Sequence, residues 1–219
     1  MNNNYRLIRK ADFMEYYDYL KILEKDIHSV VLAINDEHGH PATAFMDVML
    51  TDKNGIYFMT SRGKDIYARM NNNEYVALSG MVGTDFFNSK MISVRGKIRN
   101  IGNARVIELF EANPYMYKIY PTENGREVID VFQIYEGEGE YIDFSTTPPV
   151  RTSFSFGGKE VSKHGYFITG ECTSCGTCAS KCPMKCIEPS TPYKIHEENC
   201  LHCGNCYYSC PIKAVKKYN

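Results

Sequence analysis

The cysteines of this chain are confined to its C-terminal quarter and follow a repeated spacing. The chain has 219 residues, and its nine cysteines all lie between Cys172 and Cys210. The run C-x-x-C-x-x-C-x-x-x-C-P begins at Cys172 and begins again 28 residues later at Cys200. A segment of roughly 55 residues cannot easily bury a sufficient core and needs disulfides or metal. The repeat therefore constrains this segment to a fold that is built around thiols.

The overall composition is that of an ordinary globular protein with little net charge. Hydrophobic residues make up 43% and charged residues 23%, and the formal net charge is −1, which argues against a nucleic-acid binder with a basic surface. Apolar runs such as Val30–Ile34 are far shorter than the ~18 residues of a membrane span, and the polar N-terminus lacks the apolar core of a signal peptide. We expect a cytoplasmic protein with no nucleic-acid or membrane partner, in which clustered cysteines indicate metal binding or catalysis.

The cysteine runs carry a specific resemblance. Two-residue gaps let three thiolates converge on one face of a cuboidal cluster, and Gly176 and Gly204 let the backbone approach the sulfurs closely. With a proline after each fourth cysteine, the tail resembles a bacterial ferredoxin with two 4Fe–4S clusters. The resemblance implies one cluster on Cys172, Cys175, Cys178 and Cys210, and a second cluster on Cys200, Cys203, Cys206 and Cys182. Two zinc sites with four cysteine ligands each, or disulfides, are the alternatives, and they fit this spacing poorly.

Two residues of the cysteine segment have no place in that ligand set. Aligning the two runs puts the ninth cysteine, Cys186, opposite Ala214, where a small buried residue suits the position. Its alternatives are a spare ligand or a redox thiol. His202 lies inside the second ligand loop, and we interpret it as a loop residue on the solvent side or as a tuner of the cluster potential.

The N-terminal part shows the rhythm of a β protein with inserted helices. Helical spacing predicts helices over 12–25, 62–72 and 103–112, with Asp12 and Ser61 as N-caps. Alternating apolar runs between turn signals predict strands over 29–35, 42–50, 56–60, 75–82, 91–100, 131–135 and 141–144. We expect a small β-barrel domain over residues 1–150, a linker over 151–163, and the cysteine domain over 164–219.

The order of these elements, together with three short motifs, resembles the pyridoxamine-phosphate-oxidase-like split β-barrel. The motifs are Ile56–Lys64, Asn71–Asn73 and Val94–Lys97. The resemblance implies a mainly β, Greek-key fold with flanking helices, joined here to a small α+β ferredoxin-like domain. It also implies FMN at the interface of a homodimer, although some members of the superfamily use a deazaflavin or haem.

A phosphate site is expected where the third predicted strand ends and a helix begins. The free N–H groups and the dipole of a helix start favour an anion, and the side chains there add hydroxyls and charge from Thr60, Ser61, Arg62 and Lys64. By resemblance, Thr60, Ser61 and Lys64 match the phosphate motif, and the backbone of Ala44, Phe45 and Met46 lines the flavin ring. The alternative is an N-cap followed by a solvated cation.

Some residues depart from the family pattern. Ala44 stands where many members have an arginine that reaches the phosphate, and the chain lacks the lysine that the oxidase itself has near Met49. These departures argue against pyridoxamine phosphate as the substrate. Arg151 is interpreted as a linker cation, with an approach to the flavin site as the alternative.

The sequence favours a flavin-dependent oxidoreductase. In this hypothesis two 4Fe–4S clusters relay electrons between an external ferredoxin-like partner and FMN, for the reduction of a small substrate. The alternatives are a non-catalytic electron-transfer relay, and a barrel that binds haem or a deazaflavin. No side chain stands out as a general acid, so no catalytic residue, substrate, electron donor or direction of electron flow is assigned.

Overall fold

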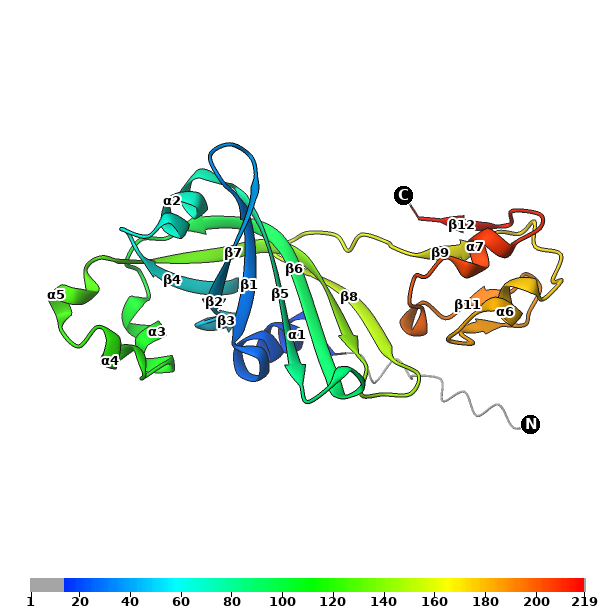
Figure 1. The fold of residues 1–219 in the computed structure, drawn as a ribbon, viewed down its shortest axis with the longest axis horizontal. Helices are drawn as coiled ribbons and strands as arrows, with labels where there is room; N and C mark the ends of the chain where they lie inside the picture. Colours follow the sequence, from blue (N-terminus) through cyan, green and yellow to red (C-terminus); the bar gives the residue numbers. More distant parts are fainter. Residues whose placement is uncertain (1–13, 219) are drawn as a thin grey trace. The chain divides into compact units, whose positions relative to one another are not determined.

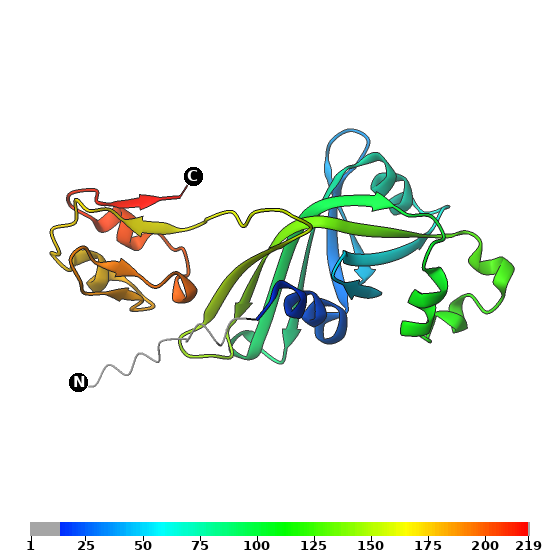
Figure 2. The same cartoon turned by 180° about the vertical axis from the view of Figure 1, so that it is seen from behind.

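The computed structural model of the chain describes residues 14–218 and divides into two compact units. One unit combines the chain up to Gly80 with Gly96–Glu136, and the other combines Met81–Arg95 with the chain from Gly137 onward. Figures 1 and 2 show the ribbon from opposite sides.

A single curled sheet holds the N-terminal strands. The strand order is β2-β1-β5-β6-β7-β4-β3, and β8 pairs with β7. The edge strands β2 and β3 follow each other in the chain with only Val48 and Met49 between them, so the sheet must curl to bring its two edges together, as in a half-barrel (Figure 1). The strands are β1 (Ser29–Asn35), β2 (Pro41–Asp47), β3 (Leu50–Asp52), β4 (Gly55–Ser61), β5 (Tyr75–Gly83), β6 (Ser89–Asn100), β7 (Ile129–Asp143) and β8 (Val150–Phe156).

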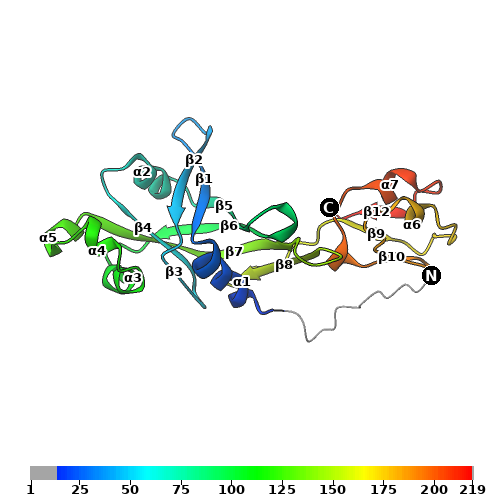
Figure 3. The ribbon, with the colours of Figure 1, turned by 60° about the horizontal axis from the view of Figure 1, so that its bottom comes forward.

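Short helices cover this sheet. Val106, Leu109 and Phe110 of α3 pack against Tyr57 and Met59 of β4 in one buried cluster, which places α3 beside the sheet (Figure 3). The helices are α1 (Tyr16–Ile22), the π-helical turn η2 (Leu23–Ile27), α2 (Asp65–Asn72), the 3-10 turn η3 (Phe86–Asn88), α3 (Val106–Ala112), α4 (Met116–Ile119) and α5 (Glu123–Arg126).

Several predicted boundaries were wrong for identifiable reasons. The predicted strand 42–50 is two strands, β2 and β3, while the predicted strands 131–135 and 141–144 are one long strand, β7. Gly137 and Gly139 lie between the two predicted strands and continue β7, where their missing side chains make room for two rings of β8. A Cβ at either glycine would approach the ring of Phe156 or Phe154 to within 3 Å.

The first half of the predicted linker 151–163 continues the sheet. Residues Val150–Phe156 form β8 and pair antiparallel with β7, and Phe154 and Phe156 are buried. The predicted N-cap Ser61 is instead the last residue of β4, and Lys64 is the N-cap of α2. The predicted N-cap Asp12 lies outside the described residues.

The cysteine segment contains only very short elements. Its strand pairs are β9 with β12 and β10 with β11. The elements are β9 (Tyr166–Ile168), α6 (Thr177–Lys181), β10 (Ile187–Glu188), β11 (Lys194–Ile195), the 3-10 turn η4 (Glu197–Asn199), α7 (Asn205–Ser209) and β12 (Val215–Lys217). Within residues 14–218, no helix is both long and apolar enough to cross a bilayer.

A buried carboxylate, Glu24, ties the first helical segment to the sheet. It is 4% exposed, and it accepts hydrogen bonds from the backbone N–H and the hydroxyl of Thr51, both at 2.7 Å. The amines of Lys21 and Lys25 lie 2.8 and 2.7 Å from its oxygens. Burial by itself would raise the pKa of Glu24, but the hydrogen bonds from the two lysines and Thr51 outweigh it and lower the pKa to about 2.

Replacing Glu24 with Gln is expected to destabilise the first unit by about 1–3 kcal/mol, because the charge-assisted bonds to Thr51 and the lysines weaken. A lowered pKa stabilises the folded state above the unfolded pKa, and that contribution is lost as the pH falls from about 4 to about 2. Glu24→Gln should therefore lose less stability than the parent protein across this window. Denaturant unfolding followed by circular dichroism at pH 7 and pH 3 measures both effects, with the exposed Glu37→Gln as the control.

Candidate functional site

All nine cysteines line two cavities in the C-terminal segment, and eight of them are the ligands expected from the sequence. These eight fall into the two sets that the ferredoxin resemblance implies, and each cavity combines three cysteines of one run with the fourth of the other. One cavity is lined by Cys172, Cys175, Cys178 and Cys210. The other is lined by Cys182, Cys200, Cys203 and Cys206, with Cys186 beside them.

The sequence repeat is also a repeat of backbone conformation. Ser174 and His202 both have φ of 56°, and Gly176 and Gly204 both have φ of 80°. The positive φ explains the two glycines, which are the N-caps of α6 and α7. It also turns backbone N–H groups toward sulfur, since Ser174 N donates to Cys172 Sγ and His202 N donates to Cys200 Sγ, each at 3.4 Å.

These cavities fit an iron–sulfur cluster by the chemistry of their donors. Each offers four thiols around a shared space, and backbone N–H···S bonds favour the thiolate form that such clusters require. Ala214 N adds a third such bond, 3.3 Å from Cys210 Sγ. A single metal ion is a different case. Among residues 14–218, no group of three or more His, Cys, Asp or Glu side chains is arranged to hold one ion.

Cys186 lies in the wall of the second cavity. It is 3% exposed, and its Sγ is 3.5 Å from Cys182 Sγ. Its counterpart in the repeat, Ala214, is 1% exposed, in keeping with a small buried residue at this position. The hydrogen bond to Cys200 and burial raise the pKa of the Cys186 thiol.

One of the two interpretations placed His202 on the solvent side of its loop, but its ring is not freely solvated. A Cβ built on Gly165 would lie 2.6 Å from its imidazole ring, so the ring packs against the backbone of the segment before β9. Burial, followed by the charge of Arg151, lowers the pKa of His202. Only glycine at position 165 leaves room for this ring.

In the barrel, the predicted phosphate residues Thr60 and Ser61 point to opposite faces of β4. Thr60 and Ser61 alternate along β4, and Thr60 is 6% exposed, with a buried Oγ1 that has no hydrogen-bond partner among the described residues. The Arg62 guanidinium instead donates to the carbonyl of Glu127. Lys64 is exposed at the start of α2. Thr60 and Lys64 therefore remain as polar groups with capacity for a ligand, whereas Arg62 is engaged with the protein.

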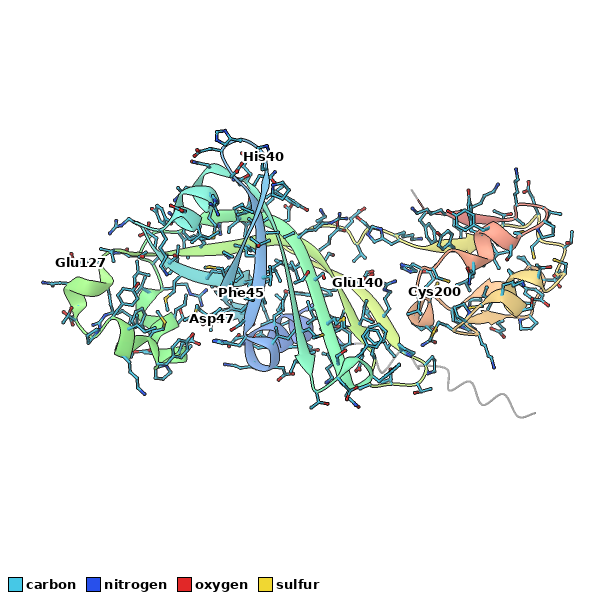
Figure 4. All side chains as sticks on the ribbon, viewed as in Figure 1. His40, Phe45, Asp47, Glu127, Glu140 and Cys200 are labelled. Atoms are coloured by element: carbon cyan, nitrogen blue, oxygen red, sulfur yellow. The ribbon has the colours of Figure 1, made fainter. Side chains whose placement is uncertain are left out.

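The predicted flavin-lining run on β2 also alternates. Ala44 and Met46 pair with the buried residues Leu32 and Val30 of β1. Phe45 lies between them and is 83% exposed (Figure 4). An aromatic side chain so fully exposed on a sheet face is a candidate contact surface.

A hydrogen-bonded group that the sequence did not reveal lies beside this run. His28 Nε2 is 3.2 Å from Tyr115 Oη, which donates to Asp47 Oδ2 at 2.8 Å, while Ser29 Oγ donates to Asp47 Oδ1 at 2.6 Å. Burial, together with the hydrogen bond to Asp47, raises the pKa of Tyr115. No sequence signal links these residues, because Tyr115 and Asp47 are 68 positions apart.

Comparisons with known proteins agree with both halves of this description. The family model for the 4Fe-4S dicluster domain matches residues 171–214. Among solved structures, the chain is similar to a NimC/NimA family protein from Clostridium acetobutylicum, with 24% identity over 64% of this chain and 91% of that chain and a TM-score of 0.52. It is also similar to a heme binding protein from Mycobacterium smegmatis, with 10% identity over 65% of this chain and 59% of that chain and a TM-score of 0.51. The comparison with curated proteins finds no match.

The chain is thus a fusion of two known architectures. Its sheet has the split-barrel fold of the solved structures to which it is similar, and residues 171–214 form a 4Fe–4S ferredoxin domain. The predicted fold class is confirmed, and so is the resemblance of the cysteine segment to a 4Fe–4S ferredoxin. The likeness to the solved structures concerns the fold.

The exchange of the fourth cysteine between the two runs can be tested by paired substitutions. Cys172→Ser with Cys210→Ser should remove one cluster and leave about four iron atoms per chain, because both residues line one cavity. Cys172→Ser with Cys182→Ser should remove both clusters, because these residues line different cavities. Anaerobic iron and sulfide analysis distinguishes them. If the second pair kept half of the iron and the first pair none, the exchange would be disproved.

Proposed function

We propose that this protein is a flavin-dependent oxidoreductase whose two 4Fe–4S clusters relay electrons between an external ferredoxin-like partner and FMN, for the reduction of a small oxidised substrate. The observation that carries the proposal is the presence of two thiol-lined cavities and a split barrel in one chain. Iron–sulfur clusters supply electrons singly, and a flavin collects two for delivery to substrate. The chain's own residues supply binding and electrostatics.

The ligand sets follow from the cavities. One cluster is assigned to Cys172, Cys175, Cys178 and Cys210, and the other to Cys182, Cys200, Cys203 and Cys206. We assign Cys186 no ligand role, since every ligand place is taken and the buried thiol fills the position of Ala214. A cytoplasmic location suits these sites, because a reducing compartment keeps their thiols free of disulfides.

The flavin is assigned to the barrel through its phosphate. The buried, unpartnered Thr60 hydroxyl and the exposed Lys64 amine supply a hydrogen bond and a positive charge. Haem is the second candidate, since a similar solved structure is that of a heme binding protein. A phosphate-bearing cofactor would account for the orphaned hydroxyl of Thr60.

A homodimer is part of the proposal. Phe45 on β2 and its cross-strand neighbour Val31 on β1 are 83% and 38% exposed, which makes an apolar patch on the outer face of the sheet. Burying such a patch against a second copy removes apolar surface from water. The flavin-lining strand β2 would then lie at the interface.

The decisive measurement is the cofactor content of protein prepared without oxygen. About eight iron atoms and one FMN per chain, with a flavin spectrum that bleaches when a reduced ferredoxin is added, are the expected result. Iron without any flavin, or haem in its place, would refute the proposal. A panel of oxidised small molecules, tested for reoxidation of the reduced protein, then separates an enzyme from a pure relay.

Replacing Thr60 with Val should have opposite effects on stability and on binding. The flavin-free protein should keep or gain unfolding free energy, up to about 1 kcal/mol, because an unsatisfied buried hydroxyl is removed. FMN affinity should fall about 5- to 10-fold, the cost of one hydrogen bond. Fluorescence titration and denaturant unfolding measure the two effects.

Thr51→Val provides the matched control, because the Thr51 hydroxyl is bonded to Glu24. It should lower stability and leave FMN affinity unchanged. Equal FMN affinity for Thr60→Val and the parent protein would contradict the phosphate assignment.

Replacing Phe45 with Asp should convert a dimer into monomers, because a charge would have to be buried in an apolar contact. Light scattering after size-exclusion chromatography gives the mass directly. Phe87→Asp is the control, since Phe87 is 75% exposed on the turn η3 and should leave the dimer intact. A parent protein that is already monomeric would refute the dimer.

A further inference from the structure

Arg151 on β8 is a cation whose surroundings leave it only partly neutralised. Its side chain is 18% exposed, and one guanidinium nitrogen, Nη2, donates to Glu140 Oε2 of β7 at 2.9 Å. The other two nitrogens, Nε and Nη1, are buried and have no hydrogen-bond partner among the described residues. Because burying an unpaired charged donor is costly, such a group indicates a negative neighbour that the protein atoms alone do not provide.

The second cysteine run approaches this cation within the same compact unit. The carboxamide of Asn199 donates to the carbonyl of Pro149 at 3.1 Å, which holds the residue before Cys200 against the residue two places before Arg151. The turn η4 packs on β8. Glu140 and Cys200 are both labelled in Figure 4.

The turn η4 ends directly before Cys200, so its packing on β8 brings the second cysteine run toward the strand that carries Arg151. The carboxylate of Glu140 pairs with Arg151, and Glu197 belongs to the turn that packs on the same strand. Arg151 therefore lies on the side of β8 from which the second run approaches, with Glu140 and Glu197 as opposing charges.

We propose that the positive charge of Arg151 raises the reduction potential of one cluster above that of the other. The cluster concerned is the one held by Cys182, Cys200, Cys203 and Cys206. The inference rests on the ligand assignment made under the proposed function. A nearby cation stabilises the reduced cluster, which carries one more negative charge. An electron from the external one-electron donor, once on the first cluster, then passes to the second, so the first is oxidised by one electron and the second is reduced by one.

Removing Arg151 and removing Glu140 should shift one reduction potential in opposite directions. A purely structural role of the ion pair would not produce opposite shifts. Arg151→Gln removes the cation and leaves Glu140 unpaired, so one reduction potential should become more negative. Glu140→Gln removes the offsetting charge and should make the same potential more positive. Arg151→Lys keeps the charge and should stay close to the parent protein.

The test is a redox titration of the anaerobic holoprotein followed by electron paramagnetic resonance, which resolves the potentials of the two clusters. Only one potential should move in each variant, and the other is the internal reference. Arg95→Gln is the matched control, because Arg95 pairs with Glu138 at 2.7 Å and should change neither potential. Shifts of the same sign in the Arg151→Gln and Glu140→Gln variants, equal shifts of both potentials, or no shift would overturn the proposal.

Iron and flavin contents of the same samples separate this proposal from the proposed function. Opposite shifts in a protein that holds no flavin would uphold the role of Arg151 while refuting the flavin function. If Arg151→Gln fails to assemble its clusters, Glu140→Gln decides alone, since a more positive potential is required of it.

Discussion

The structure of the C-terminal segment depends on the convergence of thiols from two distant runs. Its helices have five residues each and its strands two or three, and its buried cluster is built largely from cysteines, including Cys178, Cys186, Cys200 and Cys206. Elements this short have little helix or strand stability of their own. Since each cavity takes three thiols from one run and one from the other, loading either site fixes both halves of the segment at once.

In the barrel, most buried polar groups of the described residues form hydrogen bonds or ion pairs with their neighbours. Glu24 illustrates this, because four hydrogen bonds or ion pairs offset its burial. The Thr60 hydroxyl departs from the pattern, since it is buried and unpaired at the end of β4. Local departures of this kind are expected at functional sites, so the proposed phosphate contact rests on Thr60 and not on its neighbour Arg62, already bonded to Glu127.

Under the proposals made above, the β7–β8 hairpin would distinguish two chemically similar clusters. The two cysteine runs share their spacing and their φ angles at Ser174 and His202, so a charge from outside the runs is one way to make the two sites unequal. Arg151 and Glu140 lie on the hairpin, outside both runs, and form an ion pair there. A gradient of potential can thus be set without altering the ligands.

The sequence by itself determined the thiol chemistry, because ligand spacing within a tight loop is a local property and survives in any fold. It also determined most strands, including β1 to the residue, since alternating burial is local too. It did not determine that Gly137 and Gly139 continue β7, that Arg151 lies on a strand, or that His28, Asp47 and Tyr115 meet. These depend on contacts between residues that are distant in the chain, where packing of rings over glycine and the pairing of buried charges decide the outcome. Only the tertiary structure brings such partners together.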